Sequence, residues 1–238
     1  MNMKRAIFLT IAFLLCCGMA FAQTETKDGF VPGDEVIFND QVTGEKVGSA
    51  PSRWDFYFGD HCVVTTLNDS LVIKISEWYT RIIPKMKLEN YLPDKFTVEF
   101  EVWSPGFLGE SMNDHINLLL YSEYREDLVE VELNPAVCPD PREHAPISYH
   151  YYNPSDEYSD SILTDPIPVA KALKQDTWAK VQASFDKGSF KYYLNGELMV
   201  SLSNVARPTR MALESVSNCD EQDRFYVRNI RIAKFSDK

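Results

Sequence analysis

Residues 96–103 read FTVEFEVW, and apolar side chains occupy every second position of this stretch. A period of two is the pattern of a β-strand that is buried on one face and wet on the other. Residues 116–121 (INLLLY) and 129–133 (VEVEL) follow the same pattern. The three stretches therefore predict strands that turn their apolar rows toward one core.

The segment Asn195-Gly196 supplies the strongest turn signal, because it separates two short strand-like runs, 191–194 and 197–200. Asn-Gly between such runs is typical of a two-residue β-hairpin. Further strands are expected at Val36–Phe38, Trp54–Phe58, Cys62–Leu67, Leu71–Ile75, Arg81–Met86, Ile147–Tyr152, Trp178–Phe185, Phe190–Leu194, Leu198–Leu202, Arg210–Glu214 and Phe225–Ala233. About fourteen short strands exceed what one open sheet usually holds, so we predict an all-β fold of two packed antiparallel sheets.

The N-terminus has the pattern of an export signal. Lys4 and Arg5 precede an apolar run of about 15 residues, shorter than the ~20 that span a bilayer, and Ala20-Phe21-Ala22 gives the small-x-small cleavage pattern. We therefore expect a signal peptide at 1–22 and one domain at 23–238, with no transmembrane segment after cleavage. The predicted location is secreted across the inner membrane: periplasmic, outer-membrane-associated or extracellular. A membrane anchor is the alternative.

The chain is acidic, with a formal net charge of −11 at pH 7. Nucleic acids and anionic lipid headgroups prefer positively charged surfaces. The charge therefore argues against nucleic acid as a partner and is compatible with neutral glycans, basic proteins or cations.

Three cysteines follow the predicted cleavage site: Cys62, Cys138 and Cys219. Cys138 and Cys219 both lie in turn-like sequence, whereas Cys62 begins an apolar strand. An odd number in an oxidising compartment is typical of one disulfide and one remaining thiol, so a Cys138–Cys219 bridge with Cys62 buried is one interpretation and three free thiols the other. The cysteines and the four histidines show no zinc spacing.

The segment from Asn153 to Thr177 lacks a strand pattern and carries four acids, Asp156, Glu157, Asp160 and Asp165. Calcium takes several oxygen ligands from a defined loop, but the order of an EF-hand is absent. A solvated acidic loop is therefore favoured over a calcium site, and no cofactor is predicted.

Three C-terminal stretches resemble the concanavalin A-like lectin/glucanase superfamily, which includes laminin-G-like domains. They are Trp178-Ala-Lys-Val181, Tyr193-Leu-Asn-Gly196 and the final strand Tyr226–Ala233. The resemblance implies a jelly-roll sandwich that binds ligands on the concave face of one sheet. Arg228 stands where the superfamily often has an acid, which argues against a calcium site there.

The N-terminal half is similar to a module that precedes the peptidoglycan-binding domain in some OmpA-family envelope proteins. The similar stretches are Phe30–Phe38, Pro51–Asp55 and Tyr91–Phe100. The similarity implies an envelope location but does not extend to the peptidoglycan-binding domain itself.

Ligand-binding candidates follow from the alternation if the strands around Phe100, Leu118, Val131 and Tyr149 are neighbours. Their outward rows would then combine aromatic rings with carboxylates and amides, the groups that bind sugars. The candidates are Glu101, Trp103, His115, Asn117, Tyr121, Glu132, His150 and Tyr152, with Glu99 and Glu130 beside them. The alternative is a polar outer face that only confers solubility.

Catalysis would need two carboxylates across a glycosidic bond. Glu99/Glu101 and Glu130/Glu132 are same-face pairs roughly 6.5–7 Å apart by strand rise. The glucanase branch of the superfamily places three acids on one strand, but Trp103 and Asn134 occupy the third position here. A polysaccharide lyase using His150 and Tyr152 fits less well still.

These observations favour a secreted or envelope-associated binding module, for a glycan or a cell-envelope partner, that does no catalysis. A glycoside hydrolase using a pair of glutamates is one alternative, and a structural envelope scaffold with no small ligand is the other.

Overall fold

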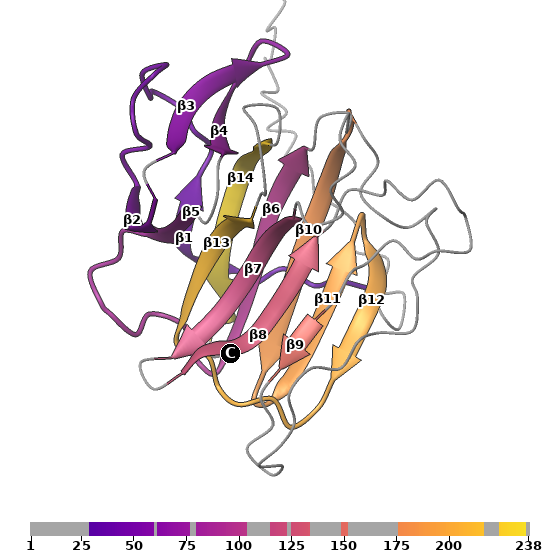
Figure 1. The fold of residues 1–238 in the computed structure, drawn as a ribbon. Helices are drawn as coiled ribbons and strands as arrows, with labels where there is room; N and C mark the ends of the chain where they lie inside the picture. The colour runs from indigo at the N-terminus through magenta and orange to yellow at the C-terminus, as the bar shows by residue number, and fades with distance from the viewer. Residues whose placement is uncertain are drawn as a thin grey trace, which may run out of the picture.

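The computed structural model describes residues 29–59, 61–76, 80–103, 115–122, 125–133, 149–151, 176–216 and 224–236. The regular structure of this part of the chain consists of fourteen β-strands, which confirms the all-β prediction. The strands form two antiparallel sheets that pack face to face as the layers of a sandwich (Figure 1).

Sheet A contains eight strands: β1 (Glu35–Asp40), β3 (Cys62–Leu67), β4 (Ser70–Ser76), β6 (Lys95–Trp103), β10 (Trp178–Asp186), β11 (Ser189–Leu194), β12 (Glu197–Leu202) and β14 (Arg224–Lys234). Seven of them follow the order β12-β11-β10-β6-β14-β4-β3. One edge of β14 pairs with β6, and the other pairs with β4 and then with β1. The last strand of the chain therefore lies in the middle of sheet A.

Sheet B contains six strands: β2 (Trp54–Phe58), β5 (Thr80–Pro84), β7 (His115–Ser122), β8 (Arg125–Leu133), β9 (Tyr149–Tyr151) and β13 (Arg210–Val216). Their order is β2-β5-β13-β7-β8-β9. In both sheets we call the face turned away from the shared core the outer face.

The core lies between the sheets and is built from the alternating apolar rows. Phe100 of β6, Leu118 of β7 and Val131 of β8 are each buried in it. Trp54 is also fully buried, and its indole Nε1–H donates a hydrogen bond of 2.7 Å to Asp40 Oδ2. Partnering in this way removes the cost of burying a polar N–H.

The predicted hairpin joins β11 to β12 through Asn195 and Gly196, whose φ angles are 52° and 82°. Both residues have a left-handed backbone conformation, which matches the turn type that Asn-Gly favours. Asn195 also accepts a hydrogen bond of 2.8 Å at Oδ1 from the Lys180 backbone N–H, so the turn is tied to β10.

Residues 29–33 cross the outer face of sheet A. The Gly33 amide donates to Thr97 Oγ1 at 3.0 Å, and its carbonyl accepts from Arg231 Nη2 at 2.6 Å. A Cβ at Gly33 would lie 2.6 Å from the Lys234 carbonyl oxygen, so only glycine permits this approach. Thr97 is fully buried beneath the segment although it projects away from the core.

The expected signal peptide, residues 1–22, lies outside the described residues. Within the described ranges, no helix is long and apolar enough to cross a membrane.

Candidate binding site on the outer face of sheet B

The fold separates the predicted ligand-binding residues into two groups. β7, β8 and β9 are consecutive neighbours in sheet B, as expected, but β6 lies in sheet A. Glu101 and Trp103 therefore lie on the opposite side of the molecule from Asn117 and Tyr121. The condition that all four strands are neighbours is therefore not met, because alternation fixes which side of a strand is apolar but not which sheet contains it.

On sheet A the predicted acids are paired with basic residues of neighbouring strands. Glu99 lies 3.0 Å from both Lys180 Nζ and Arg231 Nη1. Glu101 accepts from Arg228 Nε at 2.7 Å, and the Arg228 guanidinium lies 3.9 Å from the centre of the Trp178 ring. These contacts neutralise both carboxylates, and they follow from the register, which places β10 and β14 on either side of β6.

Trp103 also belongs to sheet A. Its ring packs edge-to-face against Tyr226 with centroids 5.3 Å apart, and it is half-buried. This contact is of the kind that stabilises a sheet face.

A different polar row crosses the outer face of sheet B, and we call it the sheet-B row. It comprises Arg81 of β5, Glu214 of β13, Asn117 of β7 and Glu130 of β8. Arg81 Nε lies 2.6 Å from Glu214 Oε2. Asn117 Nδ2 donates to Glu130 Oε1 at 2.7 Å and is 3.5 Å from Glu214 Oε1.

The strand register brings these residues together. Arg81 is opposite Glu214, and Glu214 is opposite Asn117. Glu130 is opposite Leu119, which lies two positions after Asn117 on β7. The row thus links strands that are up to 133 positions apart in sequence.

The row runs from exposed to buried. Tyr57 of β2, whose ring centre lies 5.5 Å from the Arg81 guanidinium, is 51% exposed. At the other end Glu214 is 4% and Asn117 1% exposed. Leu119 and Ala212, both buried on the same face, place an apolar strip next to the row.

Asn117 Oδ1 has no hydrogen-bond partner among the described residues, although it is buried. Leaving such an acceptor unpaired costs about 1–3 kcal/mol. Because the Nδ2 group of Asn117 already faces the two carboxylates, the oxygen is the part of this amide that retains unused hydrogen-bonding capacity. The row therefore contains one amide oxygen without a partner, beside the carboxylates of Glu130 and Glu214.

The structure describes only part of the remaining predicted site residues. Tyr121 lies on β7 and is half-buried. His115, Glu132 and His150 belong to β7, β8 and β9; their side chains, like Tyr152 and the Cys138–Cys219 pair, lie outside the described residues. Cys62 is buried with a free thiol, as predicted.

Arg81, Glu214 and Tyr57 were not predicted as site residues. Each occupies an outward position of its strand, which periodicity alone could have assigned to an outer face. Periodicity does not reveal that β13 pairs with β5 and β7, because this pairing joins segments that are remote in sequence.

No group of three or more histidine, cysteine or acidic residues suited to a metal ion occurs among the described residues. The acidic segment considered for calcium lies in residues 153–177, of which the structure describes only 176 and 177.

Several solved structures have a fold similar to that of this chain. The carbohydrate recognition domain of Emp47p is 12% identical with a TM-score of 0.53, and the match covers 83% of this chain and 94% of that domain. The metal-free exoplasmic/lumenal domain of VIP36 is 13% identical with a TM-score of 0.52, over 84% of this chain and 91% of that one.

The binding domain of botulinum neurotoxin serotype D is 17% identical with a TM-score of 0.56 over 85% of this chain. The match covers 49% of that domain, so this chain spans about half its length. No protein-family model matches the chain, and no curated protein matches it in sequence. At these identities the likeness establishes the fold alone: a two-sheet antiparallel β-sandwich.

Proposed function

We propose that this protein is a non-catalytic glycan-binding module whose ligand docks on the outer face of sheet B, at the sheet-B row. The observation that carries the proposal is the unpartnered, buried Oδ1 of Asn117, whose Nδ2 contacts the carboxylates of Glu130 and Glu214. Sugars present several hydroxyl donors, and clustered acceptors of fixed orientation are what such a ligand requires.

Two further features support a sugar. The exposed Tyr57 ring offers surface for the apolar face of a sugar ring. The fold likeness to a domain named for carbohydrate recognition, and to a neurotoxin domain solved in complex with N-acetylneuraminic acid, agrees with this ligand class.

A glycoside hydrolase is the second candidate, now through Glu130 and Glu214. Their Oε1 atoms lie 2.7 and 3.5 Å from Asn117 Nδ2, so the two carboxylates are near enough to each other to allow the separation of a retaining pair, about 5–5.5 Å. Binding is favoured because Glu214, an acceptor of Arg81, could serve only as the nucleophile, which would leave Glu130, itself an acceptor from Asn117 Nδ2, as the acid. We expect no hydrolysis of chromogenic glycosides.

We also propose that the protein is exported, which would agree with this function because glycans are exposed outside the cytoplasm. The signal-peptide pattern at 1–22 and the similarity to an OmpA-associated module favour an envelope or secreted location. N-terminal sequencing of the exported protein should give Gln23 as the first residue.

The test is a printed array of neutral and acidic oligosaccharides, followed by calorimetric titration with the best binder. Asn117→Ala and Glu214→Gln should each weaken binding at least tenfold. Both variants should keep the far-ultraviolet circular dichroism spectrum and the cooperative melting of the unmodified protein. Glu101→Gln is the matched control, since Glu101 is also an arginine-paired glutamate but lies on sheet A. It should bind normally.

No binding across the array, or equal loss with Glu101→Gln and Glu214→Gln, would remove the proposal. Turnover of a glycoside that Glu130→Gln abolishes would replace it with the hydrolase.

A further inference from the structure

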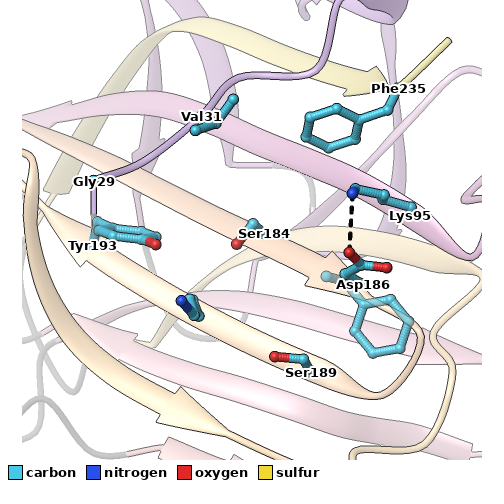
Figure 2. Close-up of a pocket in the computed structure, with 10 residues that line it drawn as sticks. Gly29, Val31, Lys95, Ser184, Asp186, Ser189, Tyr193 and Phe235 are labelled. Atoms are coloured by element: carbon cyan, nitrogen blue, oxygen red, sulfur yellow. Dashed lines mark ion pairs between the residues drawn. The ribbon is translucent and has the colours of Figure 1, made fainter. Parts of the chain in front are cut away.

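A pocket of about 310 Å³ opens on the outer face of sheet A, away from the sheet-B row. β6, β10 and β11 form its floor, the segment containing Gly29 and Val31 forms one side, and Phe235 closes the end (Figure 2). Its volume is at the lower end of the range for small-molecule sites, which suits a ligand of roughly one sugar ring.

Contacts between the two chain ends hold these walls in place. Gly33 is fixed to Thr97 and Arg231, as described above. Ser236 donates to Asp34 twice, from its backbone N–H and from its hydroxyl, each at 2.6 Å. The segments that contribute Val31 and Phe235 are therefore tied to each other and to the sheet.

The floor carries an excess positive charge. Lys95 Nζ lies 3.0 Å from Asp186 Oδ2, so these two charges offset each other (Figure 2). Lys191 projects from β11, opposite Ser184, and has no ion-pair or hydrogen-bond partner in the described part of the chain. In a protein of net charge −11, this pocket thus holds one unmatched ammonium group.

The other groups suit a polyhydroxylated molecule. Ser184 and Ser189 provide hydroxyls that donate and accept, and Asp186 provides carboxylate oxygens that accept. Val31 and the Phe235 ring supply an apolar wall, with the Lys95 ammonium 4.6 Å from the centre of that ring.

We propose that this pocket is a second binding site, for a monosaccharide unit that bears a carboxylate, such as a hexuronic acid. Lys191 binds the carboxylate by a charge-assisted hydrogen bond, which is stronger than a neutral one. The serines and Asp186 bind ring hydroxyls. A simple inorganic anion fits less well, because it would leave the apolar wall uncovered and face the carboxylate of Asp186.

The test is an NMR titration of the ¹⁵N-labelled protein with glucuronate, with glucose as the neutral analogue and sulfate as the anion without a ring. Glucuronate should shift the backbone amides of Ser184, Ser189 and Lys191, and glucose should bind at least tenfold more weakly. Sulfate should not displace glucuronate. Lys191→Met should reduce glucuronate affinity at least tenfold, and Lys191→Arg should restore most of it.

Lys74→Met is the matched control, because Lys74 lies on the outer face of sheet A but does not line the pocket. It should bind glucuronate normally. Asn117→Ala should also leave this site intact, so the two proposed sites fail independently. Equal affinity for glucose and glucuronate, competition by sulfate, or unchanged binding by Lys191→Met would each overturn the inference.

Discussion

Tyr192 and Tyr91 show how the contribution of a tyrosine hydroxyl to stability depends on its hydrogen-bond partners. Tyr192 is fully buried in the core, and its hydroxyl has no hydrogen-bond partner among the described residues. The Tyr91 hydroxyl donates to the Met211 carbonyl at 3.1 Å and accepts from the Met211 amide at 2.9 Å. The two hydroxyl groups are therefore expected to contribute to stability with opposite signs.

Removing each hydroxyl should reveal this difference. We expect Tyr192→Phe to raise the free energy of unfolding by about 1 kcal/mol, because it removes a buried unpaired polar group. Tyr91→Phe should lower it by about 1–2 kcal/mol, because it leaves the Met211 amide unpaired. Urea unfolding of both variants measures the two values, and a loss of stability in both would show that the Tyr192 hydroxyl is bonded.

Strand β6 shows how one element serves two surfaces. Its inward residue Phe100 is 1% exposed, whereas the outward Glu101 is half-buried against Arg228. The period of two was readable in the sequence, so the strand and its buried side were predicted correctly. The partners of its outward acids were not, because they come from β10 and β14, which lie far along the chain.

The alternation of β6 predicts a large difference between adjacent substitutions. Phe100→Ala should cost about 3–5 kcal/mol, since it loses transfer free energy and leaves a cavity. Glu101→Ala should cost less than about 1 kcal/mol, since it breaks a partly exposed ion pair while Arg228 keeps its contact with Trp178. Equal costs in urea unfolding would mean that β6 is buried on both faces.

The whole molecule depends on pairings that no local pattern encodes. β14, near the end of the chain, lies between β6 and β4 and also pairs with β1. The strands, the Asn195-Gly196 turn and the sandwich were all predictable, because each depends on neighbouring residues. The site was predictable only in part: Asn117 and Glu130 were named, but Arg81 and Glu214 join them through sheet order alone.

We expect the buried ionisable groups to make the whole fold sensitive to alkali. Burial raises the pKa of the Cys62 thiol to about 12, and it also raises the pKa of Tyr91 and Tyr192. These groups stay neutral in the folded state, whereas in the unfolded chain they ionise near about 8.5 for cysteine and 10 for tyrosine. Their stabilising contribution is therefore complete below about pH 8 and is lost as the pH rises toward 12.

Urea unfolding at pH 8 and at pH 10.5 should show this loss as a fall in the free energy of unfolding. The double variant Cys62→Ala/Tyr192→Phe should show a smaller fall, whatever its stability at pH 8. An equal fall in the double variant would assign alkaline sensitivity to other groups.

The central claim is that a glycan binds the outer face of sheet B at Asn117, and NMR observes that face directly. The ¹⁵N-labelled protein is titrated with the best-binding neutral oligosaccharide from the array, and the side-chain amide signal of Asn117 is followed with the backbone amides of β7, β13 and β4. We predict saturable shifts of the Asn117 side-chain signal and of β7 and β13, with β4 unchanged. A bound glycan that shifts β4 or other sheet A strands and leaves Asn117 unmoved would contradict the account.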